Sequence, residues 1–320
     1  TTLFRSALGM KAGMAAVGTA FRRLRSVQRG SRRMRAVSDR VHRSTRRAMD
    51  RLGVPPSAQN RVHRAICTAT GHPVDVATGK VFTESVDVEL PGPLPFVLER
   101  VWYSTSTYEG PFGHGWHHRY DLGLAVEDGV AVVRLPDGRC ASFAPPEPGA
   151  PSWNAGERMW LRIEEGRHIL EEEASGLRYH FGASRAGSGL ATPPPWLSVE
   201  EVEDRNGNRL RFGYDASGAL VAVEDSAGRR IDLRCDDRGR IVQVLGPRPG
   251  RPGQQMILAS YRYDEAGHLV EASDGLGNPI RYRYDDQRRL VQETDRFGLS
   301  FHFAYEGEGP SSRCTRTWGD

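Results

Sequence analysis

The chain has 320 residues, enough for two or three domains, and its hydrophobic content of 38% is that of a folded protein. Its four cysteines lie 73 or more residues apart, which excludes a CxxC metal or redox motif; they are Cys67, Cys140, Cys235 and Cys314. We interpret them as unpaired thiols of a protein made in a reducing cytoplasm. We expect no secretory signal, because the first residues lack a proper apolar core and a small-residue cleavage site.

The first part of the chain is strongly basic. Residues 1–66 hold 16 basic and two acidic side chains, a net charge of +14, while the remainder has a net charge of −10. Residues 10–21 are small and apolar but are interrupted by Lys11, and they are shorter than the roughly 20 residues that cross a bilayer. Residues 21–51 contain twelve arginines and a narrow apolar stripe at helical spacing, which predicts a basic amphipathic helix that ends before Pro55.

We expect residues 1–66 to be a docking segment that packs on the acidic remainder of the chain or on a partner protein. A solvated linker is one alternative, and contact with an anionic membrane or with nucleic acid is another. Arginine runs without interleaved aromatic rings argue against stacking on single-stranded nucleic acid. If the segment is mobile when its partner is missing, limited proteolysis should cut first between Arg22 and Arg64.

From residue 71 the pattern changes to short strands separated by turns. Residues 81–90 alternate between apolar and polar side chains, residues 98–104 are a further strand, and a glycine-rich turn follows with the sequence Gly113-His114-Gly115-Trp116-His117-His118. Three histidines so close together raise the question of a zinc site. Their spacing suits no standard helical ligand pair, and no second cluster supports them. We therefore interpret the motif as a turn anchored by Trp116 and expect no metal.

The middle of the chain continues as short strands and hairpins. Pro136-Asp137-Gly138 is a hairpin signal between strands at 130–135 and 139–143, and further short strands are expected at 160–163, 168–172 and 177–181. Three prolines at 193–195 mark the best domain boundary. The sequence thus predicts a basic helical segment (residues 1–66), a β-rich domain (residues 67–195) and a repeat array (residues 196–320).

The last part of the chain repeats itself. Tyr263-Asp264 is echoed 21 residues later by Tyr284-Asp285 and 42 residues later by Tyr305-Glu306, and Tyr214-Asp215 has the same form. Asp followed by Gly three residues on is a type I turn signal, because the carboxylate accepts the backbone N–H two or three residues later. This spacing occurs at Asp204/Gly207, Asp215/Gly218, Asp225/Gly228, Asp236/Gly239, Asp264/Gly267, Asp274/Gly277 and Asp295/Gly298. The turns leave about six or seven residues for each strand, which is a normal strand length.

Between these turns the side chains alternate with a period of two. Leu210, Phe212 and Tyr214 fall on one face of a strand, while Arg209 and Arg211 fall on the other. One apolar face and one solvated face are typical of antiparallel sheets. An isolated hairpin is marginal in water, so successive hairpins must pair. The sequence predicts a mainly β protein whose last part is a long antiparallel meander.

The YDxxGxL pattern at a 21-residue period resembles the YD repeat of RHS-repeat proteins. It is carried by Tyr214, Asp215, Gly218, Asp236, Gly239, Tyr263, Asp264, Gly267, Tyr284, Asp285 and Tyr305. Three departures weaken single turns, since Cys235 stands in place of Tyr, Arg288 in place of Gly and Glu306 in place of Asp. Upstream, the sequences GHPVDVATGKV and FGHGWHHRY resemble the domain that precedes YD repeats in bacterial RHS toxins; the second contains Gly113, Gly115 and Trp116.

The resemblance implies both a fold and a function. It implies that the sheet curls into a hollow shell, which fits a sheet with one apolar face and little in the chain to cover it. It also implies the shell region of a polymorphic toxin that houses and delivers a C-terminal toxin domain in competition between bacteria. Implied partners are that toxin domain, a type VI secretion spike or a chaperone at residues 1–66, and indirectly an immunity protein. We expect the array to continue beyond Asp320, and the protein to be made in the bacterial cytoplasm before delivery.

We expect no catalytic residue and no cofactor in this chain. Turns explain the regularly placed acids, and no GxSxG, HExxH or P-loop motif occurs. In the family, the self-cleaving aspartyl site and the toxic enzyme follow the repeats. The alternative function is a cell-surface module whose YD repeats bind carbohydrate.

The repeat tyrosines are predicted to build the wall of the sheet. Each lies at a strand end just before its turn, so we expect the rings of neighbouring hairpins to lie close together and each phenol to reach a backbone group. Replacement of Tyr284 by Ala is then expected to cost about 3–5 kcal/mol of stability. In a carbohydrate-binding stripe, the same change would leave the melting temperature unchanged and abolish glycan binding.

Overall fold

The computed structural model describes residues 49, 74–75, 79–184 and 196–320. The chain divides into two compact units, residues 1–82 and residues 83–320. In the first unit, β1 (Val74–Asp75) pairs antiparallel with the start of β2 (Lys80–Leu90). The predicted helix of the basic segment lies outside the described residues except for Met49, which is helical and buried. Among the described residues, no helix has the length and apolar character to span a membrane.

The second unit is built of antiparallel strands. β2 continues into it and forms a sheet with β3 (Phe96–Tyr103) and β6 (Trp116–His118). β4 (Glu109–Gly110) and β5 (Gly113–His114) form a short hairpin in the connection between β3 and β6. A three-stranded ribbon follows, whose first strand also pairs with β14; its strands are β7 (Gly123–Glu127), β8 (Val130–Arg134) and β9 (Cys140–Phe143).

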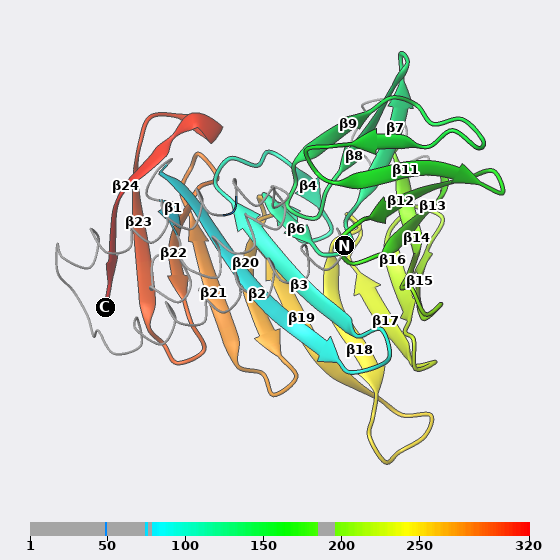
Figure 1. Cartoon of the computed structure of the whole chain (residues 1–320). Helices are drawn as coiled ribbons and strands as arrows, with labels where there is room; N and C mark the ends of the chain where they lie inside the picture. The colour runs from blue at the N-terminus through cyan, green and yellow to red at the C-terminus, as the bar shows by residue number, and fades with distance from the viewer. Residues whose placement is uncertain (1–48, 50–73, 76–78, 185–195) are drawn as a thin grey trace. The chain divides into compact units, whose positions relative to one another are not determined.

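The large sheet is an antiparallel meander in which each strand from β10 to β24 pairs with the next (Figure 1). Its first strands are β10 (Ser152–Asn154), β11 (Met159–Glu164), β12 (Arg167–Glu172), β13 (Arg178–Ser184) and β14 (Leu197–Glu203). The repeat strands are β15 (Arg209–Tyr214), β16 (Leu220–Glu224), β17 (Arg230–Cys235), β18 (Ile241–Pro247), β19 (Gln255–Tyr263), β20 (Leu269–Asp274), β21 (Pro279–Tyr284), β22 (Leu290–Thr294), β23 (Ser300–Glu306) and β24 (Arg313–Gly319). The prediction of a mainly β chain with a long antiparallel meander is confirmed. The predicted boundary at residue 195 stays a prediction, and β13 pairs with β14 across it.

The Asp–Gly turns share one geometry. The N–H of the fourth residue donates to the carbonyl of the Asp, as Gly218 does to Asp215 at 3.1 Å. The Asp215 carboxylate accepts from the N–H of Ser217, two residues on, as the sequence predicts, and also from the N–H of Ala219, four residues on. The turn glycines have φ values of 74° to 90°, a region that favours glycine. At the one turn without glycine, Arg288 takes a φ of 64°.

The repeat tyrosines lie together along one edge of the meander, because alternate turns lie at opposite edges. The strand register shifts at every turn of this edge, directly before Tyr214, Cys235, Tyr263, Tyr284 and Tyr305. The pairings around the turns at the opposite edge are regular. A β-bulge strengthens the local twist of a strand and redirects its side chains. Among the Asp–Gly turns, the bulge is therefore a feature of the Tyr–Asp edge; the longer connection between β18 and β19 at the opposite edge has a register shift of its own, between Val244 and Leu245.

The apolar face of the repeat sheet is covered in part by the segment that precedes the repeats. Three ring pairs join them: Phe112 with Tyr261 at 4.9 Å, Trp116 with Tyr282 at 5.1 Å, and Tyr120 with Phe212 at 4.9 Å. The sequence-based expectation that little in the chain covers this face is therefore wrong for the strands that carry these rings. The alternation of apolar residues revealed the face, but nothing local in the sequence indicated what lies on it.

Candidate functional site

Each repeat tyrosine is tied to the strand that precedes its own. The phenol donates a hydrogen bond of 2.7–3.0 Å to a backbone carbonyl of that strand; the pairs are Tyr214 with Val199, Tyr263 with Ile241, Tyr284 with Leu269 and Tyr305 with Leu290. Where the tyrosine is missing, the Cys235 thiol lies 3.5 Å from the carbonyl of Leu220. These side chains therefore fasten successive hairpins together, in addition to the backbone ladder of the sheet.

The ring neighbours of these tyrosines differ from the expected ladder of aromatic rings. The residue after the turn glycine pairs with the Asp of its own turn and also packs on the next repeat tyrosine. Arg240 lies 4.3 Å from the ring of Tyr263, and Arg289 lies 5.0 Å from the ring of Tyr305. At the turn between them, the ring of His268 stacks on Tyr284 at 4.8 Å. A cation or an imidazole thus links each of these three turns to the following hairpin.

One turn lacks both parts of this contact. Ala219 occupies the position of the cation, and Cys235 occupies the position of the ring that the cation would contact. Burial raises the pKa of the Cys235 thiol to about 11, so the thiol stays protonated near neutral pH. Burial likewise raises the pKa values of Tyr263, Tyr284 and Tyr305, which keeps these phenols available as hydrogen-bond donors.

A buried ion pair lies where the preceding segment meets the repeats. Arg100 and Asp87 are 0% and 3% exposed, and the Nε of Arg100 lies 2.5 Å from Oδ2 of Asp87. Tyr261 donates to Asp87 at 2.9 Å, and Arg100 donates to the hydroxyl of Tyr282 at 3.1 Å. The guanidinium also lies 4.5 Å from the ring of Trp116. Because a buried charge needs a partner, this cluster fixes how β2 and β3 lie on the repeat sheet.

The glycine-rich motif contacts the repeat turns directly. A Cβ at Gly113 would lie 2.5 Å from the carbonyl oxygen of Gly267, and one at Gly115 would lie 2.5 Å from Nε1 of Trp102. Both glycines have positive φ values, 81° and 75°. The indole of Trp116 is fully buried and donates to the hydroxyl of Tyr284 at 3.0 Å. The glycine-rich motif and the repeats are separate features in the sequence, but in the structure they pack directly against each other.

The three histidines of this motif point to different partners. His114 lies 3.0 Å from Glu109, and His117 lies 2.8 Å from the hydroxyl of Ser106. His118 is buried, and its ring makes an edge contact with Phe112 at 5.7 Å. Each imidazole thus has its own neighbour, and the three rings do not converge on a common point.

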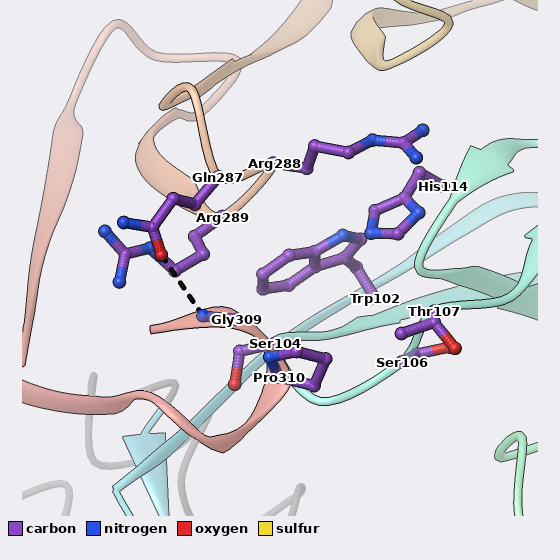
Figure 2. A pocket seen from close by; sticks show the side chains of 10 residues that line it. All are labelled: Trp102, Ser104, Ser106, Thr107, His114, Gln287, Arg288, Arg289, Gly309 and Pro310. Carbon is purple, nitrogen blue, oxygen red and sulfur yellow. Dashed lines mark hydrogen bonds between the residues drawn. The ribbon is translucent and has the colours of Figure 1, made fainter. Parts of the chain in front are cut away.

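Arg288, which replaces the turn glycine, reaches the same region. Its guanidinium lies 2.6 Å from Glu109 and donates to the ring of His268 at 3.1 Å. Beside it lies a cavity of about 190 Å³ (Figure 2), lined by Trp102, Ser104, Ser106, Thr107, His114, Gln287, Arg288, Arg289, Gly309 and Pro310. One wall is held in place by Gln287, which accepts a hydrogen bond from the N–H of Gly309 at 3.1 Å. The departure from glycine at residue 288 thus provides a side chain at the wall of this cavity.

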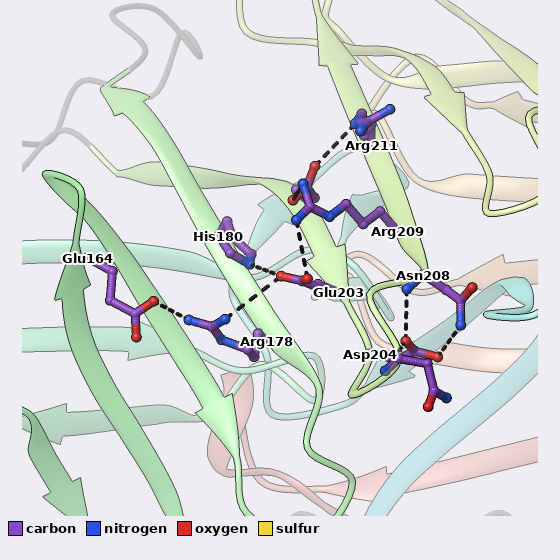
Figure 3. A network of polar contacts seen from close by, with 10 residues as sticks. Glu164, Arg178, His180, Glu203, Asp204, Asn208, Arg209 and Arg211 are labelled. Atoms are coloured by element: carbon purple, nitrogen blue, oxygen red, sulfur yellow. Dashed lines mark hydrogen bonds and ion pairs between the residues drawn. The ribbon is translucent and has the colours of Figure 1, made fainter.

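A second polar cluster, which includes His180 and Glu203, lies on β13, β14 and β15 (Figure 3). Ligand atoms of His180, Glu201 and Glu203 lie within 4.8 Å of one another, and these residue types suit a zinc ion. Both carboxylates already have cationic partners, because Arg209 lies 3.3 Å from Glu201 and 3.2 Å from Glu203. Arg211 lies 3.2 Å from Glu201 as well. We interpret the cluster as an ion-pair network of the sheet surface.

Sequence reasoning missed the buried cluster around Arg100 and the residues that follow the turn glycines. A signal for Arg100 was present, since alternation places it on the same face of its strand as Leu98 and Trp102, where a charge is unusual. A signal for Arg240, His268 and Arg289 was their common position four residues after a turn Asp. Asp87, Tyr261 and Tyr282 carried no comparable signal, since each belongs to an ordinary alternating strand.

Two protein-family models match the chain. The model described as RHS Repeat matches residues 214–249 and 263–300, and a domain of unknown function (DUF6531) matches residues 71–143. The chain is 29% identical to double-stranded DNA deaminase toxin A of Burkholderia cenocepacia, over 69% of this chain and 15% of that protein. It is 26% identical to the toxin protein Tse5 of Pseudomonas aeruginosa, over 77% of this chain and 21% of that protein.

A probable deoxyribonuclease, RhsA of Dickeya dadantii, is 26% identical over 68% of this chain and 15% of its own length. The chain therefore covers about a fifth or less of each of these relatives. Among solved structures, the complex of TcdB2 and TccC3 without the hypervariable C-terminal region is 12% identical over 70% of this chain and 12% of that chain, with a TM-score of 0.31.

Proposed function

Since the chain is an RHS-repeat protein, we propose that it forms part of the shell of a bacterial toxin, in which the repeat sheet encloses a toxin domain of the same polypeptide. The observation that carries the proposal is the row of tyrosine hydroxyls that fastens each hairpin to the one before it. A container needs such a continuous wall, whereas a catalytic domain does not. We place the toxic activity in another part of the polypeptide.

We extend the proposal to delivery. The toxin is made in the cytoplasm, loaded on a type VI secretion spike and passed to a competing cell, while an immunity protein protects the producer. Residues 1–66 would contact the spike or a chaperone, and their net charge of +14 favours an acidic partner surface. Nucleic acid or an anionic membrane would be an alternative partner for the same segment.

The test uses the whole polypeptide that the gene encodes. Its toxin domain should resist trypsin while it is enclosed, and paired Tyr263→Ala and Tyr284→Ala substitutions should open the wall and expose it. Arg262→Ala is the matched control, because this side chain lies beside Tyr263 but is 74% exposed on the solvated face. Digestion of the toxin domain at the same rate in the intact protein and as an isolated domain would refute the proposal.

A carbohydrate-binding module is the competing function. Such a module needs tyrosine rings and hydroxyls that face a ligand. The hydroxyls of the repeat tyrosines instead donate to carbonyls within the sheet, which supports the wall. Binding of residues 1–320 to a glycan array, abolished by Tyr284→Ala at an unchanged melting temperature, would favour the module.

A further inference from the structure

A serine at the wall of the cavity shown in Figure 2 contacts a buried histidine. The Oγ of Ser106 lies 2.8 Å from Nε2 of His117, and Ser106 lines the cavity of about 190 Å³. Ser106 itself is half-buried, whereas His117 is 1% exposed. Ser106 thus borders the cavity, while its imidazole partner is shielded from solvent. A hydroxyl bonded to an imidazole is the arrangement that activates a serine nucleophile.

The imidazole is held in place and uncharged. It stacks on the ring of Tyr108 at 4.9 Å with an interplanar angle of 14°. Gly138 packs closely against it, since a Cβ there would lie 2.5 Å from Cε1 and Nε2 of the ring. Burial lowers the pKa of His117 to about 4, with a smaller opposing contribution from the charge of Asp121. At neutral pH the ring thus has a free lone pair, which a general base requires.

Three buried polar atoms near this pair have no hydrogen-bond partner within the part of the chain that the structure describes. They are Nδ1 of His117, Oδ2 of Asp121 and Nε1 of Trp102. Such atoms are rare in folded proteins and call for an explanation. Asp121 is the strongest charge acting on His117, and it favours the imidazolium that forms when Nε2 takes up the Oγ proton. Trp102 is 1% exposed and forms part of the cavity wall, but its Nε1 is buried beside Gly115, where an added Cβ would lie 2.5 Å away, so this side chain shapes the cavity.

We propose that Ser106 is a nucleophile that accepts a short acyl group from an ester or a thioester bound in this cavity. Oγ of Ser106 bonds to the acyl carbon, and the bond from that carbon to the leaving oxygen or sulfur breaks. The Oγ proton passes to Nε2 of His117 and then to the leaving alkoxide or thiolate. The products are an ester on Ser106 and a free alcohol or thiol, so no oxidant or further reactant is needed.

The size of the cavity limits the acyl group. A volume of about 190 Å³ corresponds to roughly six water molecules at about 30 Å³ each, enough for a chain of a few carbons. Each protein molecule is acylated once, on Ser106, and this acylation is independent of the role proposed for the repeat sheet as a wall. A purely structural role is the competing explanation, because Oγ of Ser106 also accepts the backbone N–H of Tyr108 at 3.2 Å.

The test treats the full chain with a fluorophosphonate probe and with p-nitrophenyl acetate, and locates the label by mass spectrometry. We expect labelling of Ser106 at least about tenfold faster than that of Ser175, an exposed serine whose hydroxyl bonds to Glu172. His117→Gln should lower the rate of labelling about 100-fold or more, whereas Ser175→Ala should leave it unchanged. No label on Ser106, or equal labelling in the His117→Gln variant, would overturn the proposal.

A second variant separates reactivity from folding. Ser106→Cys keeps a polar atom beside His117, and the introduced thiol should react with iodoacetamide faster than the native Cys140, which is exposed. This advantage should disappear when His117→Gln is added. Equal rates for the two thiols before His117 is changed would show that His117 does not activate this position, which would also overturn the proposal.

Discussion

Tyr284 makes two hydrogen bonds through one hydroxyl group. It donates to the carbonyl of Leu269 at 3.0 Å and accepts from the indole of Trp116 at 3.0 Å. We expect Tyr284→Phe to cost about 2 kcal/mol, because two buried polar groups lose their partner. Tyr305 is the matched control, since its hydroxyl donates to Leu290 at 2.8 Å and Tyr305→Phe should cost about 1 kcal/mol. Urea unfolding of both variants measures the difference, and equal losses would contradict it.

His117 gives the fold a dependence on pH. Burial lowers its pKa to about 4 in the folded chain, whereas an unfolded histidine titrates near 6.5. Between these values the unfolded chain binds a proton that the folded chain rejects, so stability is full above about pH 6.5 and falls as the pH drops toward 4. The loss from this group is on the order of 3 kcal/mol. Urea unfolding at about pH 7 and about pH 5 should show a smaller loss for His117→Gln than for the unchanged chain.

The individual residues also show how far sequence reasoning reaches. The positions of Tyr214, Tyr263, Tyr284 and Tyr305 follow from periodicity alone, because a repeat imposes its spacing on the chain. Their partners do not follow, since each phenol bonds to a carbonyl 15 or 22 residues earlier, on a strand that becomes its neighbour only after folding. The contact between Ser106 and His117 likewise depends on how the loop after β3 folds back, so no local sequence pattern predicts this contact.

At the scale of elements, the turn at Arg288 tests why glycine occupies the other turns. Its φ of 64° is costly for a residue with a Cβ, by about 1 kcal/mol. Both Arg288→Ala and Arg288→Gly lose the contacts to Glu109 and His268, but only glycine relieves the backbone. We therefore expect the glycine variant to be about 1 kcal/mol more stable than the alanine variant in urea unfolding.

Arg289 supplies the control for this comparison. It follows Arg288 directly and does not have a positive φ, so its alanine variant should be at least as stable as its glycine variant. If the alanine variant were at least as stable as the glycine variant at residue 288 as well, the turn at residue 288 would carry no backbone strain.

The strands and turns themselves could be predicted because their signals are local. An Asp with Gly three residues on, and an alternation with a period of two, are read within one hairpin. The bulge at the Tyr–Asp edge could not be predicted, because it depends on the register of two paired strands. The pairing of β7 with β14 has a similar origin, since Leu124 and Leu197 are 73 residues apart in the sequence.

At the scale of the second unit, the segment before the repeats and the repeats form a single structure. Residues from β2, β3 and β6 supply Asp87, Arg100 and Trp116, and β19 and β21 supply Tyr261 and Tyr282. Five strands from distant parts of the sequence thus meet at one buried charge. We infer that residues 83–143, which are part of the family-matched domain, and the repeats stabilise one another.

This mutual dependence predicts a specific result for the ion pair of Arg100 and Asp87. Arg100→Met leaves the Asp87 carboxylate buried without its cation, which should cost about 3–5 kcal/mol. Adding Asp87→Leu removes the orphaned charge, so the double variant should be more stable than Arg100→Met alone even though Tyr261 and Tyr282 lose partners. A double-mutant cycle in urea measures the coupling, with hydrogen exchange of β19 and β21 as a second readout. Exchange in these repeat strands should rise in Arg100→Met and recover in the double variant, while additive losses and unchanged exchange would mean that the two parts fold independently.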